Sequence, residues 1–312
     1  MNGFLGLDTS NYTTSVAFCS QTGEVLQEKH LLPVKTGEMG LRQSDAVFHH
    51  VRQLPEMTEK LFARGALDVT AVAASDRPQQ KDGSYMPCFL VGAGAARELG
   101  ALLHIPVHFF THQQGHVAAA LYGADKLSLI HEPFLAFHVS GGTTDALLVR
   151  PDATCGIACE VVAHSLDLKA GQLIDRVGGM LGLPFPAGPA LEKLALEAPQ
   201  KKLPKATMDG ACCHLSGVQN QCETLLKKGA SPAAVARFCL SSVEAALTAM
   251  TETLLMTYGD LPLLYAGGVM SNSLLREHLT ARFGGSFAPP AFSADNAVGI
   301  AVLCRLKEEG EL

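Results

Sequence analysis

The hydrophobic pattern of the first half of the chain predicts a three-stranded meander followed by alternating helices and strands. The segment from Asp45 to Arg64 is helical in pattern, although Pro55 is expected to interrupt it. The β-branched content of 67–75 indicates a buried strand. The predicted elements are, in order, strands at 4–8, 13–19 and 24–31, a helix at 45–64, a strand at 67–75, a helix at 90–103, a strand at 105–110 and a helix at 112–122.

The second half repeats this order with a longer polar insertion. Ser231 and Pro232 are typical of an N-cap and a first helical turn. Apolar residues then recur every three or four positions from Val235 to Leu254, so this long helix is expected to lie in the core. The remaining elements are strands at 134–139, 144–150 and 157–164, a helix at about 169–181, a polar insertion at about 182–230, a strand at 262–268 and helices at about 273–283 and 295–308.

A repeated stretch indicates two similar lobes. FLGLDTSNYTTSVA at 4–17 and FLAFHVSGGTTDAL at 134–147 align at a constant offset, with Phe, Leu, Ser and two Thr residues at equivalent positions. A repeat of about half the chain length predicts an α/β protein with lobes at 1–130 and 131–312, each opening with a hairpin. The last helix is expected to pack back onto the first lobe. If the lobes face each other, their two polar turns can grip a phosphate chain.

Composition narrows the class of protein. The chain has 312 residues, of which 47% are hydrophobic and 17% charged, as in a soluble globular protein. We expect no apolar run long enough to cross a bilayer and no leader peptide, and the nine cysteines lack CxxC spacing. Reduced cysteines in a cytoplasmic protein are therefore expected. A net charge of −6 argues against a dedicated nucleic-acid binder, so RNA contact would need a local basic patch or a surface shared with a partner.

The turn Ser140-Gly141-Gly142 joins two predicted strands and is a candidate anion site. Glycines let an anion approach bare backbone N–H groups, although a lone turn of this kind is more often an ordinary hairpin.

His112 and His116 lie four residues apart on a predicted helix, so they face the same side and could chelate one metal; two surface histidines are the alternative. Gly115 favours function, because a glycine inside a helix suggests that something approaches closely. Gln113 stands where a zinc protease of the HExxH type needs Glu, which disfavours proteolysis.

Other polar segments are weaker candidates. The loop Gly267–Asn272 follows a strand and could pack against a nucleotide. Asp295 is either a helix N-cap or a third metal ligand, and Asp175 is either functional or part of a solvated face. The polar loop at 76–87 follows a strand, where ligands bind in open α/β sheets. The basic clusters that could grip RNA are Lys201, Lys202, Lys205, Lys227 and Lys228, with an ordinary solvated loop as the alternative.

Together these motifs resemble the TsaD/Gcp-type tRNA threonylcarbamoyltransferases of the actin/Hsp70/sugar-kinase superfamily, over nearly the whole chain. The resemblance implies two ribonuclease-H-like lobes of βββαβαβα topology. The family motifs match Asp8 to Ser10, His112 to His116, Val139 to Thr144, Gly171 to Arg176, Phe185 to Ala195, Leu215 to Gly217, Gly267 to Asn272 and Ala294 to Ala297.

The resemblance also implies a site and a reaction. A divalent metal, iron or zinc, would be bound by His112, His116 and Asp295 as catalytic residues in a cleft between the lobes. The implied reaction moves threonylcarbamoyl from its adenylate to an adenosine of tRNA beside the anticodon.

Implied partners are a shorter paralogue and a small ATPase, and a dimer is compatible with the resemblance. An adenine nucleotide (threonylcarbamoyl-AMP, ATP or AMP) would contact Ser140, Gly141, Gly142, Thr143, Thr144, Asp175, Gly188, Gly268 and Asn272.

The chain departs from the family pattern at several ionisable positions, most of them acidic. Tyr12 and Thr13 replace an acidic pair, Gln114 replaces a Glu expected around the metal, Thr143 replaces a His, and Leu168 replaces an Asp. An acyltransferase is the leading hypothesis. The lost carboxylates favour an alternative, a non-catalytic nucleotide-binding paralogue that scaffolds or regulates a true transferase. A kinase of the same superfamily is a third hypothesis, for which no Asp stands clearly as a general base.

Overall fold

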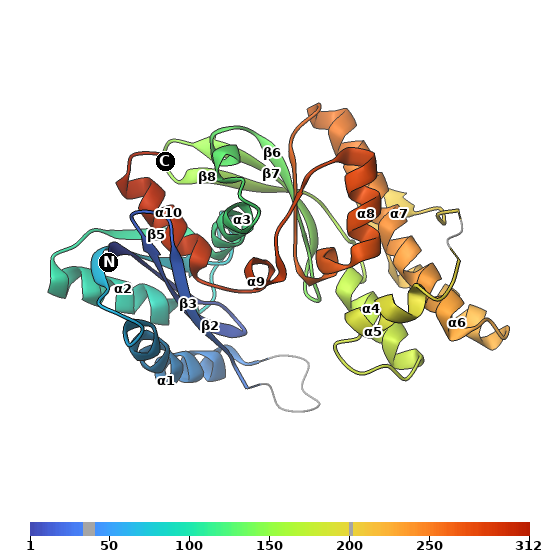
Figure 1. Ribbon diagram of the computed structural model, residues 1–312, viewed down its shortest axis with the longest axis horizontal. Coiled ribbons are helices and arrows are strands. Elements are labelled where there is room, and N and C mark those ends of the chain that lie inside the picture. The colour runs from blue at the N-terminus through green and yellow to red at the C-terminus, as the bar shows by residue number, and fades with distance from the viewer. Residues whose placement is uncertain (34–40, 200–201) are drawn as a thin grey trace. The chain divides into compact units, whose positions relative to one another are not determined.

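The computed structural model describes residues 1–33, 41–199 and 202–312, which form two compact units. Unit 1 consists of Met1–Glu132, Arg150–Cys159 and Ala291–Leu312, and unit 2 of Pro133–Val149 and Glu160–Pro290. The last helix, drawn in red in Figure 1, lies beside the blue strands of unit 1. Each unit therefore contains segments that are distant in sequence.

Unit 1 is built around a five-stranded sheet of order β3-β2-β1-β4-β5. The β1, β2 and β3 strands form an antiparallel meander, whereas β4 runs parallel to β1 and β5 runs parallel to β4. Its elements are β1 (Asn2–Thr9), β2 (Thr13–Ser20), β3 (Val25–Leu31), α1 (Gln43–Phe62), β4 (Asp68–Arg77), α2 (Phe89–Leu103), β5 (Val107–Thr111), α3 (His112–Gly123), η1 (Leu127–His131) and α10 (Val298–Glu308).

Helices cover the sheet of unit 1, which explains why its central strands β1 and β2 are buried along almost their whole length. Leu54 and Leu61 of α1 pack in one cluster with Leu5 and Phe18 of the sheet. A Cβ built on Gly6 of β1 would lie 2.5 Å from the backbone nitrogen of Ala301, so α10 approaches β1 very closely. Because both faces of these strands are covered, their apolar stretches Phe4–Leu7 and Val16–Cys19 do not alternate with polar residues.

The predicted interruption of the first helix at Pro55 is wrong, because α1 runs without a break from Gln43 to Phe62. A proline inside a helix removes one hydrogen bond and costs about 3 kcal/mol. The neighbouring Leu54 and Met57 are buried against the sheet. Their packing offsets the cost of the proline, a tertiary effect that local propensity does not report.

Unit 2 has a five-stranded sheet of order β12-β11-β6-β7-β8. β6 and β7 are antiparallel, and β11 runs parallel to both β6 and β12. Its elements are β6 (Phe134–Val139), β7 (Thr144–Asp152), β8 (Gly156–His164), α4 (Ala170–Met180), α5 (Gly188–Ala195), β9 (Thr207–Asp209), β10 (Cys212–His214), α6 (Ser216–Lys227), α7 (Pro232–Tyr258), β11 (Leu263–Ala266), η2 (Gly268–Ser271), α8 (Ser273–Phe283) and β12 (Ser286–Phe287). The short α9 (Pro290–Ser293) follows, and all of it except Pro290 belongs to unit 1.

The two sheets confirm the predicted fold class. Each has a three-stranded meander at one side and two further parallel strands at the other, in the order expected for βββαβαβα lobes. The repeated stretches open β1 and β6, and these strands lie in different sheets. The chain is therefore an α/β protein with two ribonuclease-H-like lobes.

The polar insertion of unit 2 is more structured than its composition suggests, because it contains α5, the small β9–β10 sheet and α6. Leu191, Cys213 and Cys222 of these elements join the same core as α7. By length and composition α7 is apolar enough to cross a membrane, contrary to the expectation that the chain has no such run. However, 78% of its most apolar window is buried inside the protein, so its apolarity is accounted for by its place in the core.

Candidate functional site

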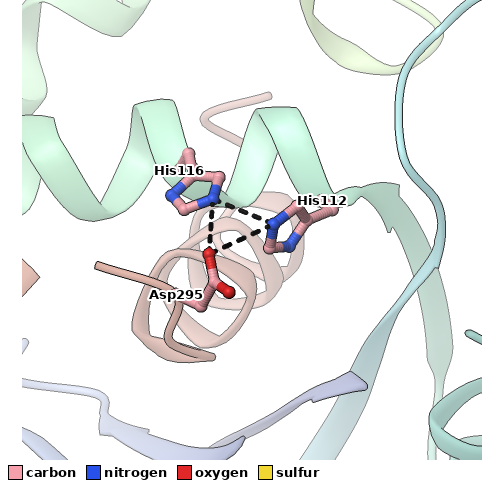
Figure 2. Close-up of side chains that lie close together, drawn as sticks. All are labelled: His112, His116 and Asp295. Carbon is pink, nitrogen blue, oxygen red and sulfur yellow. Dashed lines mark hydrogen bonds and ion pairs between the residues drawn. The ribbon is translucent and has the colours of Figure 1, made fainter. Parts of the chain in front are cut away.

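His112, His116 and Asp295 lie together in unit 1 and point toward one another (Figure 2). The Nε2 atoms of the two histidines are 2.9 Å apart. Oδ1 of Asp295 is 3.2 Å from Nε2 of His116 and 3.6 Å from Nε2 of His112. One ligand atom from each residue lies within 4.8 Å of the others, a spacing that one metal ion can bridge.

The beginning of α3 sets the orientation of the two histidines. The Thr111 side chain accepts a hydrogen bond from the Gln114 backbone N–H, and the Gln114 side chain accepts one from the Thr111 N–H. This reciprocal capping box starts the helix at His112. His116, four residues later, consequently lies on the same face.

Gly115 has a different role from the one expected. The close approach that it permits is made by α10, since a Cβ on Gly115 would lie 2.9 Å from Cδ1 of Ile300. The predicted close approach at Gly115 is therefore present, but it is made by a helix of the same unit and does not by itself favour a functional role. The glycine instead lets α3 and α10 cross closely, and α10 is the helix that follows Asp295.

The alternative interpretation of Asp295 as a helix cap is also wrong. Ala297 occupies the N-cap position of α10, and Asn296 accepts a hydrogen bond from the Val298 N–H at 3.0 Å. Oδ2 of Asp295 instead accepts a hydrogen bond from the Thr13 hydroxyl at 3.3 Å. The Asp295 carboxylate is thus directed at the histidine pair rather than at the helix.

Two further residues contact the cluster and were not among the predicted site residues. Asp8, at the end of β1, is fully buried, and its Oδ2 is 2.9 Å from Nδ1 of His112. Nζ of Lys29 donates to the Asp295 backbone oxygen at 3.4 Å. The sequence signal for Asp8 was its place in the opening motif, directly before a polar turn.

The electrostatics of the cluster suit a cation. Burial lowers the pKa of His112, but the charge of Asp8 and hydrogen bonds with Asp295 and Asp8 outweigh it and raise that pKa to about 10. Burial opposes ionisation of Asp295, but hydrogen bonds with His112 and His116 hold its carboxyl pKa well below the usual range. In the metal-free cluster, His112 therefore carries an additional proton, and with it a positive charge, beside the carboxylates of Asp8 and Asp295. A metal ion would take the place of that proton.

Gln114 lies elsewhere than expected. It is only 2% exposed, and its Nε2 donates to the backbone oxygens of Cys155 at 2.9 Å and Ile157 at 2.8 Å. It therefore connects α3 to the Arg150–Cys159 segment of unit 1 and does not take part in the metal cluster. Its position two residues from each histidine directs it to a different side of α3.

The polar loop at 76–87 connects to the same segment. Gln80 donates to the Ile157 oxygen at 3.1 Å and accepts from the Cys159 N–H at 2.7 Å. The Pro78 oxygen accepts from the Gln113 N–H at 3.0 Å, at the start of α3. The loop thus lies beside the first turn of the helix that carries the histidines.

In unit 2, the predicted phosphate turn is shaped by its own serine. Oγ of Ser140 accepts hydrogen bonds from the N–H groups of Gly142 at 3.3 Å and Thr143 at 3.2 Å. Gly141 and Gly142 are exposed, whereas Thr144 is buried and accepts from the first turn of α4. The two glycines are thus the accessible part of the turn.

Glycines bring two further segments close to this turn. A Cβ on Gly171 of α4 would lie 2.6 Å from Cα of Gly141, and a Cβ on Gly267 would lie 2.1 Å from the oxygen of Val139. The turn after β6 is therefore flanked by the start of α4 and by the loop after β11, which contains Gly268. Such close approach leaves no room for a side chain at these positions.

The other predicted nucleotide contacts follow on from these segments. Asp175 is half-buried on α4, and its Oδ1 accepts from the Ala187 N–H at 2.8 Å, next to Gly188. It is therefore not simply part of a solvated face. Asn272 is the N-cap of α8, and its Oδ1 accepts from the Leu275 N–H at 3.2 Å.

Four of the five lysines in the predicted basic clusters are among the described residues. Lys201 lies outside the described residues, and Lys202 and Lys205 are exposed. Lys227 forms an ion pair of 2.7 Å with Glu223 on the same helix, so part of its charge is locally balanced. Among the described lysines, Lys202, Lys205, Lys227 and Lys228, the structure shows no arrangement that favours an RNA-binding surface over an ordinary solvated one.

Comparisons with known proteins agree with the motifs and the fold. The sequence profile of TsaD, the tRNA N6-adenosine threonylcarbamoyltransferase, matches residues 30–302. A tRNA N6-adenosine threonylcarbamoyltransferase of Thermus thermophilus is 31% identical over 96% of this chain and 90% of its own length.

Solved structures share the fold at low identity. Full-length HypF in a phosphate- and nucleotide-bound form has a TM-score of 0.62 at 13% identity, covering 98% of this chain and 55% of that one. The ROK hexokinase of Thermus thermophilus has a TM-score of 0.53 at 15% identity, covering 98% of this chain and 99% of the hexokinase. Because the TsaD profile spans most of the chain and a relative above 30% identity covers nearly all of it, this protein belongs to the TsaD family of tRNA N6-adenosine threonylcarbamoyltransferases.

Proposed function

We propose that this protein transfers a threonylcarbamoyl group from its adenylate to an adenosine of tRNA beside the anticodon, using a divalent metal. The observation that carries the proposal is the convergence of His112, His116 and Asp295, with one ligand atom from each within 4.8 Å of the others. It occurs in a chain of the TsaD family, whose named members carry out transfer to tRNA.

The donor set fits a catalytic ion. Two imidazoles and one carboxylate suit zinc or iron(II), and three protein ligands leave coordination positions for substrate. When bound, such an ion supplies Lewis-acid polarisation of the carbamoyl carbonyl. His112, His116 and Asp295 would hold it, while the Thr13 hydroxyl, bonded to the second oxygen of Asp295, orients that carboxylate.

The nucleotide part of the substrate is assigned to unit 2. Gly141 and Gly142 are exposed at the turn after β6 and would receive the phosphate of the adenylate. Asp175 would contact the ribose, while Gly268 and Asn272 would contact the adenosine side. Holding the leaving group in this way would orient the acyl carbon for attack, which is a positioning contribution to catalysis.

The replaced acidic residues do not contradict this proposal. Gln114 serves as a buried link to two backbone oxygens, and Leu168 is part of the hydrophobic core of unit 2. Thr13 keeps a hydrogen bond to Asp295. The remaining departures at Tyr12 and Thr143 leave the three metal-ligand candidates intact. The positions that differ are thus accommodated, and the cluster on which the proposed chemistry depends is present.

A transfer assay tests the proposal. Purified protein is loaded with zinc or iron(II) and supplied with threonylcarbamoyl-adenylate and unmodified tRNA, with and without the shorter paralogue and the small ATPase expected as partners. We expect turnover by the wild-type protein, and its loss in His116→Ala with tRNA association preserved. Nucleotide binding without turnover in every combination would instead support the non-catalytic paralogue that the acidic replacements first suggested.

A further inference from the structure

We propose that Asp8 is a positioning residue that holds His112 with its Nδ1 protonated and its Nε2 directed at the metal. This inference rests on the proposed function, because it concerns the same metal cluster. Asp8 is not one of the three candidate metal ligands. It contacts the nitrogen of His112 that faces away from His116 and Asp295.

Asp8 is buried in the sheet, so its role in the site is to position another side chain rather than to contact a substrate. It lies in β1, the central strand of the sheet, and has no solvent exposure. Oδ2 is 2.9 Å from Nδ1 of His112, and Oδ1 accepts a hydrogen bond from the hydroxyl of Ser75. Ser75 is itself fully buried on the neighbouring strand β4. Ser75 of the adjacent strand therefore holds Oδ1 of this carboxylate, which leaves Oδ2 for His112.

The tautomer of His112 follows from which atoms of the two side chains can donate a hydrogen bond. An ionised carboxylate can only accept hydrogen bonds, so Nδ1 of His112 must carry the proton in the contact with Asp8. Neutral His112 then has its lone pair on Nε2. Nε2 is the atom that lies 2.9 Å from Nε2 of His116 and 3.6 Å from Oδ1 of Asp295. The buried carboxylate consequently selects the tautomer that can bind the ion.

A second contact limits rotation of the ring. The centroids of the His112 and Phe89 rings are 5.9 Å apart, with the planes tilted by 56°. Phe89 is almost fully buried at the start of α2. Asp8 fixes one end of the imidazole and Phe89 restricts one of its sides, so Nε2 is held in place before the ion arrives. Carboxylates that orient ligating histidines in this way typically contribute about 10- to 100-fold to metal affinity.

The test compares zinc affinity in Asp8→Asn with that of the wild type, measured by competition with a chromophoric chelator. We expect about 10- to 100-fold weaker zinc binding in Asp8→Asn. The matched control is Asp68→Asn, the same substitution at an exposed position of the same unit, which should bind zinc as the wild type does. Equal affinity in wild type and Asp8→Asn, with both proteins folded by circular dichroism, would overturn the inference.

A spectroscopic measurement on the wild type decides the question even if Asp8→Asn does not fold. In zinc-loaded protein with ¹⁵N-labelled histidine, His112 should show a protonated Nδ1 and a metal-shifted Nε2. A metal-bound Nδ1 would overturn the proposal without any variant.

The outcomes also separate this inference from the proposed function. A wild-type protein that takes up neither zinc nor iron would overturn both. Zinc binding without transfer would overturn only the proposed reaction, since the affinity comparison and the nitrogen assignment still decide the role of Asp8.

Discussion

Gly299 of α10 lies so close to Gly115 of α3 that a Cβ at position 299 would come within 1.8 Å of the Gly115 carbonyl oxygen. This crossing has a consequence for the metal cluster. His112 and His116 lie on α3, and Asp295 lies just before α10, so the distance between the helices sets the distance between the ligands. Two glycines at the contact allow the backbones to approach as they do.

Gly299→Ala should therefore weaken both the fold and the metal site. The new methyl group has no space, so α10 must move away from α3, at a cost of about 1–3 kcal/mol in the free energy of unfolding. Zinc affinity should fall in the same variant because Asp295 moves with α10. Urea unfolding and a zinc titration check the two effects. Gly94→Ala is the control, because among the described residues nothing lies within 4 Å of a Cβ there.

Gln114→Glu should destabilise the protein rather than restore a family feature. The Gln114 amide donates to the oxygens of Cys155 and Ile157, and a carboxylate there would face both oxygens without a proton to donate. We expect a loss of about 1–3 kcal/mol, measured by chemical unfolding at neutral pH. Gln113→Glu, one position earlier in α3, serves as the control. A Gln114→Glu variant as stable as the wild type would contradict the structural role.

Substitutions at Asp295 and Asn296 should have different effects, the first on metal binding and the second on the start of α10. Asp295→Ala should abolish tight metal binding and should also destabilise the metal-free protein by about 1–3 kcal/mol, because His112 and His116 lose a charged hydrogen-bond partner. Asn296→Ala should cost about 1 kcal/mol of stability, because the Val298 N–H loses its acceptor, and should retain the metal. Zinc titrations and thermal unfolding of both variants check the pair, and the reverse pattern would restore the capping interpretation.

Asp175→Ala should weaken nucleotide binding while the protein stays folded. A carboxylate that accepts a ribose hydroxyl is worth on the order of 1.5–3 kcal/mol, which is about tenfold or more in affinity. The same carboxylate accepts from the Ala187 N–H, so the turn before Gly188 also loses an anchor. Calorimetry with AMP measures the effect, and Arg176→Ala is the neighbouring control. Unchanged affinity in Asp175→Ala would contradict the assignment of the ribose.

The ionisation of Asp167 should make the stability of the protein depend on pH in the acid range. Burial opposes its ionisation, but hydrogen bonds from the Ser216 side chain and the N–H groups of Leu215, Leu168 and Ser216 hold its carboxyl pKa well below the usual value. A lowered folded-state pKa stabilises the fold above the unfolded-state value of about 4, and this contribution is lost as the pH falls through the folded-state pKa.

Comparison of Asp167→Asn with the wild type measures this contribution. The difference in unfolding free energy should be about 1 kcal/mol at pH 7, because the side chain is 26% exposed, and should shrink steadily below pH 4. Asp209→Asn, at an exposed position of β9, provides the control for a general effect of removing a charge. A difference that does not change with pH would show that the ionisation of Asp167 does not stabilise the fold.

The sequence by itself determined the features that depend on neighbouring residues. The period of the apolar positions gave the strand and helix types, the repeat at 4–17 and 134–147 gave two lobes, and the spacing of His112 and His116 placed both on one helical face. The ordered motifs gave the family. Short elements within the insertion, such as α5 and α6, were not predicted, because their few buried residues are scattered in a polar segment.

Only the tertiary structure decided which distant residues meet. Asp8 reaches His112 across 104 positions, and Thr13 reaches Asp295 across 282, through strand pairing and the packing of α10 that no local pattern encodes. The same packing assigned Gly115 to a helix crossing and Gln114 to a buried link. Local periodicity reports how a segment folds on itself, whereas the ligand set of this site depends on close contact between segments from opposite ends of the chain.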